Sequence, residues 1–195
     1  MKRWVCLFLS IALCFFTSCS LQTTDHAYDN SYGEVIEAGK HYRILKINGD
    51  KICYQIYNTV GDIVLSEITD RPLNIDVINE NIIDIGIGMG TGLTIHKYYD
   101  IENDIISEEY LYVLANLNEL VAYIDVPENN SFQERKVIVQ NIFDESAFHK
   151  EYQLDFSNID TPVIDASFSD DGLVLSVVYL SGEEQLQKSV TLSLN

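Results

Sequence analysis

The stretch IDIGIGMGTGLTIH, residues 83–96, has glycine at every second position from Gly86 to Gly92. A dinucleotide-binding loop needs the pattern G-x-G-x-x-G at the start of a helix. Thr91 stands where the third glycine of that pattern should be, and no helical pattern follows. The alternation instead predicts a β-strand with one apolar face and one bare face, and a bulge or turn between Met89 and Gly92.

The two faces of this predicted strand have different consequences for packing. A face without side chains lets a second backbone or an aromatic ring approach closely. We therefore expect the substitution Gly88→Val to destabilise the fold. The apolar face consists of Ile83, Ile85, Ile87, Met89, Leu93 and Ile95.

The chain from about residue 40 onwards repeats the same alternation between turn signals. Asn48-Gly49, between YRILKI and KICYQIY, is the strongest short hairpin signal. The last run alternates apolar Leu186, Val190, Leu192 and Leu194 with polar residues, which is typical of a strand with one buried face. No segment of helix length has a 3.6-residue apolar period. We therefore predict an all-β fold, an antiparallel meander of about a dozen strands.

Three segments share a faint internal repeat. RPLNIDVINENIIDIGIG from Arg71 and TPVIDASFSDDGLVLSVVY from Thr161 each contain a proline, a strand, a polar turn and a second strand, and YVLANLNELVAYIDV from Tyr112 lacks only the proline. The part SFSDDGLVLSVVY resembles the strand-turn-strand unit of TolB-like and WD40-like β-propellers. That resemblance implies blades of about 40 residues. The domain has room for fewer than four such blades, so we favour a small or partial propeller, with a stacked open meander and a β-sandwich as alternatives.

The N-terminus has the features of a secretory signal. Lys2 and Arg3 precede the apolar segment 5–16, which is shorter than the roughly 20 residues of a membrane span. The run FTSC, ending at Cys19, resembles a bacterial lipobox, although Phe16 replaces the usual leucine. The resemblance implies cleavage before Cys19 and attachment of lipid, such as palmitate, to its sulfur. The alternative is an ordinary secretory signal with a chance cysteine.

This resemblance predicts the organisation and location of the chain. Residues 1–18 would be the signal peptide, residues 19–39 a flexible tether, and residues 40–195 a single all-β domain. The lipid would anchor the protein to the outside of a bacterial membrane, either the cell membrane or an outer membrane. More than one acyl chain is needed for stable anchoring, at about 0.8 kcal/mol for each buried CH₂ group.

The charge and the cysteines limit the partners. The chain has 12 basic and 30 acidic residues and a net charge of −18, which argues against binding nucleic acid or an anionic membrane surface through the protein itself. Of the four cysteines, only Cys53 lies in the predicted domain, so no intrachain disulfide is expected there. Cys53 is expected to pack as a small apolar side chain.

The common catalytic motifs are absent from the sequence. It contains no HExxH, CxxC or Gly-x-Ser-x-Gly motif and no Walker lysine. The histidines show no metal-ligand spacing, and His149 is expected on an exposed strand face. These histidines are His26, His41, His96 and His149.

Two acidic turns are candidate calcium sites, because Ca²⁺ takes oxygen ligands. Neither has the spacing of an EF-hand, and the same residue types are favoured in β-turns for local hydrogen bonds. No cofactor is expected apart from this candidate Ca²⁺. The candidate ligands are Asp100, Glu102, Asp104, Asp170 and Asp171.

These observations predict a membrane-anchored, non-catalytic binding or scaffolding module for a protein or small-molecule ligand. One alternative is an extracytoplasmic hydrolase of the glycosidase type, which would need two carboxyl groups about 5 to 10 Å apart in a cleft. Another is a purely structural envelope protein.

Overall fold

The computed structural model describes residues 33–90, 92–127 and 134–195. These residues form sixteen β-strands and no α-helix, which confirms the all-β prediction. Nowhere in this described part is there a helix of the length and apolarity that a membrane crossing requires. Residues 1–18 and Cys19 lie outside the described residues, so the predicted signal and lipid site stay predictions.

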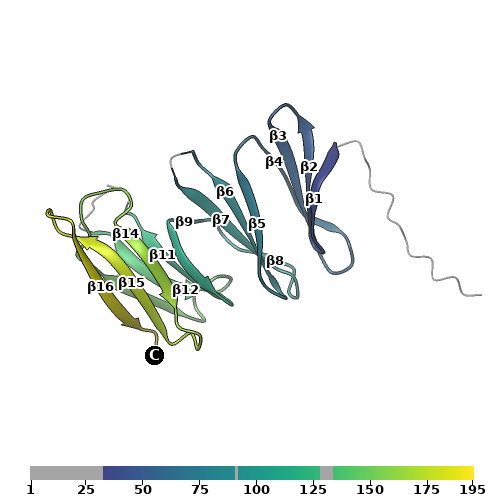
Figure 1. Ribbon diagram of the computed structural model, residues 1–195. Helices are drawn as coiled ribbons and strands as arrows, with labels where there is room; N and C mark the ends of the chain where they lie inside the picture. Colours follow the sequence, from purple (N-terminus) through teal and green to yellow (C-terminus); the bar gives the residue numbers. More distant parts are fainter. Residues whose placement is uncertain (1–32, 91, 128–133) are drawn as a thin grey trace, which may run out of the picture. The chain divides into compact units, whose positions relative to one another are not determined.

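The strands form four antiparallel sheets, each built from strands that are consecutive in the sequence (Figure 1). Sheet A contains β1 (Glu34–Ala38), β2 (Tyr42–Asn48), β3 (Lys51–Tyr57) and β4 (Ile63–Thr69). Sheet B contains β5 (Leu73–Asn79), β6 (Ile82–Gly88), β7 (Thr94–Asp100) and the short β8 (Ile105–Ile106) and β9 (Tyr110–Leu111). Sheet C contains β10 (Val113–Leu117), β11 (Leu120–Asp125), β12 (Lys136–Asn141) and β13 (His149–Gln153). Sheet D contains β14 (Val163–Phe168), β15 (Val174–Ser181) and β16 (Leu186–Ser193).

Strand β1 corrects the predicted boundary of the tether. Glu34–Ala38 lies within residues 19–39 but pairs with β2 in an antiparallel ladder. Every residue of β1 is exposed, including Val35 and Ile36. The strand therefore shows no alternation of buried and exposed residues, which is the signal by which strands are recognised in a sequence.

The predicted turns form where glycine permits a left-handed backbone. Gly49 has φ +59° between β2 and β3. Gly90 and Gly92 have φ +94° and +77°, and the Met89 N–H bonds the Leu93 carbonyl at 2.7 Å. The turn expected between Met89 and Gly92 is therefore confirmed, and it joins β6 to β7.

Strand β6 contributes side chains to both faces of sheet B. Ile83 and Ile85 pack in one core cluster with Tyr54 of sheet A, whereas Ile82 packs with Val121 of sheet C. A strand buried on both faces carries mainly apolar or small residues, because successive side chains point to opposite faces, and in β6 the buried Asp84 is the exception.

Sheet C is shared between two neighbours in the same way. Val121 belongs to the cluster with sheet B, and the next residue, Ala122, packs in the cluster with Leu175 of sheet D. Each sheet therefore packs against the next sheet in chain order. The described strands form four sheets, so the two-sheet β-sandwich alternative is not observed.

The three repeat segments correspond to equivalent places in three sheets. The segment from Arg71 forms β5 and β6, the segment from Tyr112 forms β10 and β11, and the segment from Thr161 forms β14 and β15. Each repeat is thus the first hairpin of sheet B, C or D. The strand count exceeds a dozen partly because β8 and β9, with two residues each, are too short to show a period.

Two further expectations are tested by burial. Cys53 is 1 % exposed and free, as expected for a small core side chain. In β16 and just after it, Leu192 and Leu194 are buried, but Leu186 is 57 % exposed. The prediction for Leu186 was wrong because the buried face of this strand begins further along the chain.

Candidate functional site

The candidate site is built on one face of the β6–β7 hairpin. In its register Gly86 lies opposite His96, and Asp84 lies opposite Tyr98. Paired residues and residues two apart share a face of a sheet. A Cβ atom on Gly86 would lie 3.7 Å from the Cε1 atom of His96 and 3.3 Å from the Cγ2 atom of Thr94. Because residue 86 is glycine, the space beside the His96 imidazole and the Thr94 methyl group is not filled by a side chain at that position.

The Asp84 carboxylate orients this imidazole. The Nδ1 atom of His96 lies 2.9 and 3.0 Å from the two oxygens of Asp84. Asp84 is buried, and the side-chain amide of Asn116 donates to it at 3.5 Å. An ionised carboxylate only accepts hydrogen bonds, so Nδ1 carries a hydrogen and is the donor in this hydrogen bond. No hydrogen bond to Nε2 is found among the described residues.

A series of aromatic rings packs next to the His96 ring. The Tyr98 ring stacks near the His96 ring, with centroids 6.3 Å apart and planes 20° apart. Tyr110 lies 5.7 Å from Tyr98, and Tyr123 lies 5.4 Å from Tyr110. Burial, together with the charge of Asp84, raises the pKa of Tyr98, while Asn116 opposes the rise. The Tyr98 hydroxyl therefore stays protonated at neutral pH.

A cavity of about 310 Å³ adjoins His96. Its wall combines the β6–β7 hairpin with segments of sheets C and D, and we call it the His96 cavity. The lining residues are Gly92, Leu93, Thr94, His96, Tyr112, Val113, Leu114, Ile124, Asp160, Thr161 and Val163.

Tyr112 in the cavity wall has a strained backbone. Its φ is +52°, in the left-handed region, which costs a residue other than glycine about 1–2 kcal/mol. The three other described non-glycine residues with positive φ lie in turns between strands, namely Asp104, Asn118 and Gln185. Tyr112 is instead the single residue that separates β9 from β10. Its carbonyl accepts a hydrogen bond from the Ile124 N–H at 3.1 Å. Strain of this kind persists only where the surroundings enforce it and is often found at binding sites.

Arg135 holds another part of the cavity wall. Its side chain is 1 % exposed, and its Nη1 atom donates to the carbonyls of Ile159 at 2.8 Å and Asp160 at 3.3 Å. Burial lowers the pKa of Arg135, but a guanidinium stays charged because its ordinary pKa is so high. These bonds attach the connection that carries Asp160 and Thr161 to the residue just before β12 of sheet C.

The candidate calcium ligands lie in two separate turns. The Oδ1 atom of Asp100 accepts the N–H groups of Glu102 and Asn103 at 2.9 and 3.0 Å, and Asp104 accepts the Tyr99 hydroxyl at 3.0 Å. These contacts are those of residues that cap a turn.

The second candidate group lies between β14 and β15, where Asp170 adjoins Asp171. Asp171 accepts the Ser169 hydroxyl and the Leu173 N–H at 2.6 and 3.0 Å. Within residues 33–90, 92–127 and 134–195, no three or more His, Cys, Asp or Glu side chains are grouped to hold a metal ion. The calcium assignment therefore stays a prediction.

A second cavity, which we call the acidic cavity, has a volume of about 290 Å³. Several of its carboxylates already accept hydrogen bonds. Glu102 accepts the Asn81 amide at 3.3 Å and Glu119 accepts the Asn141 amide at 2.9 Å. The lining residues are Asn79, Glu80, Asn81, Ile82, Asp100, Glu102, Asn103, Asn118 and Glu119.

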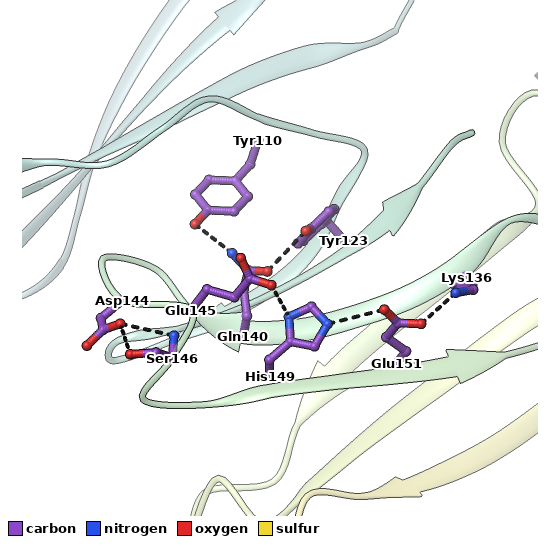
Figure 2. Close-up of polar contacts among 9 residues, drawn as sticks. All are labelled: Tyr110, Tyr123, Lys136, Gln140, Asp144, Glu145, Ser146, His149 and Glu151. Atoms are coloured by element: carbon purple, nitrogen blue, oxygen red, sulfur yellow. Dashed lines mark hydrogen bonds and ion pairs between the residues drawn. The ribbon is translucent and has the colours of Figure 1, made fainter. Parts of the chain in front are cut away.

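His149 is exposed, as predicted, and lies between two carboxylates (Figure 2). Its Nδ1 atom is 3.0 Å from Glu145 and its Nε2 atom is 3.4 Å from Glu151, which also contacts Lys136 at 2.5 Å. Exposed ion pairs of this kind contribute little to stability. Both ring nitrogens of His149 are engaged, so His149 offers less to a ligand than His96 does.

Figure 2 also shows a polar network of sheet C and the adjoining β9. The Gln140 amide donates to the Tyr110 hydroxyl at 3.2 Å and accepts from Tyr123 at 3.1 Å. The Tyr110 hydroxyl in turn donates to the Ile142 carbonyl at 2.8 Å. These bonds fix two of the rings that support His96.

The importance of His96 was not predicted, because a search for ligand spacing compares histidines with one another. The signal was the hairpin itself: the antiparallel register of β6 with β7 places Gly86 opposite His96 and Asp84 two residues before Gly86 on the same face. No protein-family model matches the chain, and no curated protein is similar enough in sequence to count as a relative. The site is therefore interpreted from its geometry.

Proposed function

We propose that this chain is a lipid-anchored, extracytoplasmic binding module that is not an enzyme, and that it holds a small ligand in the His96 cavity. The observation that carries the proposal is the histidine held by Asp84 at the wall of a cavity. Ligand sites are typically concave and mostly apolar, with a few polar groups in fixed positions. The strained backbone of Tyr112 in the same wall supports the assignment.

The N-terminal pattern supports the anchored location. A basic start, an apolar segment of signal length and the run FTSC before residue 20 occur together. The net charge of −18 would keep the domain itself away from an anionic membrane surface, so the lipid would supply the attachment.

We further propose that the four sheets are arranged as propeller-like blades. The support is that the repeat forms the first hairpin of sheets B, C and D, and that each sheet packs against the next through shared core clusters. Sites between blades of such a fold would be formed by loops and strand ends from several sheets, as the His96 cavity is.

Blocking the cavity tests ligand binding. Thr161 lines the His96 cavity and is exposed, so Thr161→Trp should fill the cavity with little damage to the core. Thr191→Trp, at an exposed position of β16, is the matched control. Saturation-transfer NMR with a mixture of small alcohols, amines, carboxylates and ketones should detect binding to the natural chain and to Thr191→Trp but not to Thr161→Trp. Equal binding to both variants would refute the cavity as the ligand site.

The anchor is tested separately by labelling with radioactive palmitate in a bacterial host. The full chain should take up label and fractionate with membranes, whereas Cys19→Ala should do neither. A Cys19→Ala protein that keeps its label would show that the lipid is elsewhere or that the assignment is mistaken.

The acidic cavity is the observation that favours the hydrolase alternative. Four carboxylates line this one cavity, and glycosidases use a pair of carboxyl groups on either side of the bond that they cleave. The four residues are Glu80, Asp100, Glu102 and Glu119. A panel of chromogenic glycosides tests it, with Glu80→Gln as the variant that should lose activity. Hydrolysis that Glu80→Gln abolishes would replace the binding proposal, and no hydrolysis of any glycoside would remove this alternative.

A further inference from the structure

We infer that the His96 cavity selects a small ligand that donates hydrogen bonds, a hydroxyl or amine compound with an apolar body, and that it discriminates against anions. This inference rests on the proposed function, since it names the ligand class of the same cavity.

The bond to Asp84 determines what the histidine offers. When the ring is neutral and Nδ1 donates the hydrogen bond to the carboxylate, Nε2 holds a lone pair and accepts hydrogen bonds. Nδ1 is occupied, so Nε2 is the polar atom that His96 has left for a ligand. A ligand group that meets it must supply an O–H or N–H.

The other polar groups of the lining lead to the same requirement. Asp160 contributes a carboxylate, which also only accepts. Thr94, Thr161 and Tyr112 carry hydroxyls that adapt to either role. None of the described lining residues is a lysine or an arginine. Arg135 lies behind this wall and donates to the carbonyls of Ile159 and Asp160, so the charged group that an anion would meet in the lining is the Asp160 carboxylate.

The remaining lining sets the shape of the ligand. Five apolar residues line the cavity together with the polar groups, which suits a ligand with an apolar body and a polar head. The volume of about 310 Å³ is at the small end of the usual range for ligand pockets, about 300–1,000 Å³. These apolar residues are Leu93, Val113, Leu114, Ile124 and Val163.

The charge of the protein distinguishes an amine ligand from an alcohol ligand. The net charge of −18 draws cations toward the protein, and Asp160 would pair with an ammonium group. A hydroxyl ligand would gain nothing from that charge and would depend on Nε2 and the threonine hydroxyls. Replacing Asp160 by asparagine therefore distinguishes an amine from an alcohol.

Four probes of one shape test the inference: benzyl alcohol, benzylamine, benzoate and acetophenone. The first two donate hydrogen bonds, whereas the last two only accept. The full chain with ¹⁵N-labelled histidine is titrated at about pH 8, which favours the neutral ring. His96→Gln identifies the resonance of His96 among those of the four histidines.

Benzyl alcohol, benzylamine or both should shift the Nε2 resonance of His96 and bind at least tenfold more tightly than benzoate and acetophenone. Thr161→Trp should abolish these shifts, and Asp160→Asn should weaken benzylamine about tenfold while changing benzyl alcohol little. Equal or tighter binding of benzoate or acetophenone in the cavity would overturn the inference and leave the proposed function standing. If no probe and no compound of the mixture used above binds in a way that Thr161→Trp prevents, both the inference and the proposed function fail.

Discussion

The Tyr54 hydroxyl in β3 donates a hydrogen bond of 2.5 Å to the Glu67 carboxylate in β4. The same carboxylate accepts a bond of 3.2 Å from Lys97 in β7, and Lys97 also lies 3.1 Å from Glu109. Tyr54 and Glu67 belong to sheet A, whereas Lys97 belongs to sheet B. This polar contact therefore joins two sheets that also share an apolar core.

This contact makes stability depend on pH. Burial favours a higher pKa for Glu67, but the bonds from Tyr54 and Lys97 outweigh it and lower the pKa below the ordinary value. A carboxyl group whose pKa is lowered by folding stabilises the protein above its unfolded-state pKa, and that stabilisation is lost as the pH falls through the folded-state pKa.

The substitution Glu67→Gln removes the titrating group and keeps an oxygen that accepts from Tyr54. In urea unfolding, the natural chain should be more stable than Glu67→Gln at neutral pH. The difference should shrink as the pH falls from about 5 to 3, around the ordinary glutamate pKa. A difference that stays constant over this range would contradict the prediction.

The glycines of β6 should differ in their tolerance of side chains. A Cβ atom at position 86 would lie 3.3 Å from the Thr94 methyl, tighter than most real contacts, and a larger side chain would also meet His96. At Gly88 the nearest atom is the Cβ of Pro72 at 3.4 Å, an ordinary contact. Gly86→Val should therefore lower the free energy of unfolding by about 1–3 kcal/mol.

Gly88→Ala is the control for this experiment, and it should change the stability by less than about 0.5 kcal/mol. Gly88→Val is still expected to destabilise, because its methyl groups extend beyond the Cβ atom toward Pro72. Thermal unfolding of the three variants gives the ranking. Equal melting temperatures for the natural chain and Gly86→Val would show that this face is not tightly filled.

The proton on His96 should depend on Asp84. In the natural chain the ¹⁵N spectrum of labelled histidine should show a protonated Nδ1 and an unprotonated Nε2 for the neutral ring of His96. Asp84→Ala removes the acceptor, so the preference for this tautomer should be lost. Asn116→Ala, which leaves both oxygens of Asp84 in place, should largely preserve it. An unchanged spectrum in Asp84→Ala would mean that the carboxylate does not orient the ring.

The turn between β15 and β16 contains a residue, Gln185, whose replacement by glycine should raise the stability of the fold. Gln185 has φ +53°, and its N–H bonds the Gly182 carbonyl at 3.3 Å. A left-handed backbone costs glutamine about 1–2 kcal/mol, whereas ordering the more flexible glycine on folding costs about 0.5–1 kcal/mol. Gln185→Gly should therefore stabilise the protein by up to about 1 kcal/mol. Gln187→Gly, two residues further on in β16, should destabilise by roughly 0.5–1 kcal/mol. Destabilisation by both variants would rule out strain at Gln185.

Local signals in the sequence account for most of the strands and turns. Asn48-Gly49 and the glycines after Met89 specify hairpins because a left-handed backbone is needed where they stand. The exposed strand β1 could not be recognised, because its residues alternate in neither polarity nor burial.

The site was harder to predict than the strands. Thirty acidic residues and four histidines offer many combinations, and their spacing along the chain distinguishes none of them. Asp84 and His96 meet because the hairpin register places them on one face, and the bare Gly86 leaves the adjoining space. Tyr112 and Asp160 reach the same cavity only through the packing of sheets B, C and D.

The sequence by itself determined the all-β class, the hairpins and the alternation of buried and exposed residues in most strands, because these depend on a few neighbouring residues. The tertiary structure alone decided that β6 is buried on both faces, that sheets pack in chain order and that His96 lines a cavity together with segments of sheets C and D. The physical reason is that a cavity is formed by segments from different sheets. Its residues are brought together by strand register and sheet packing, which depend on contacts between residues far apart in the chain.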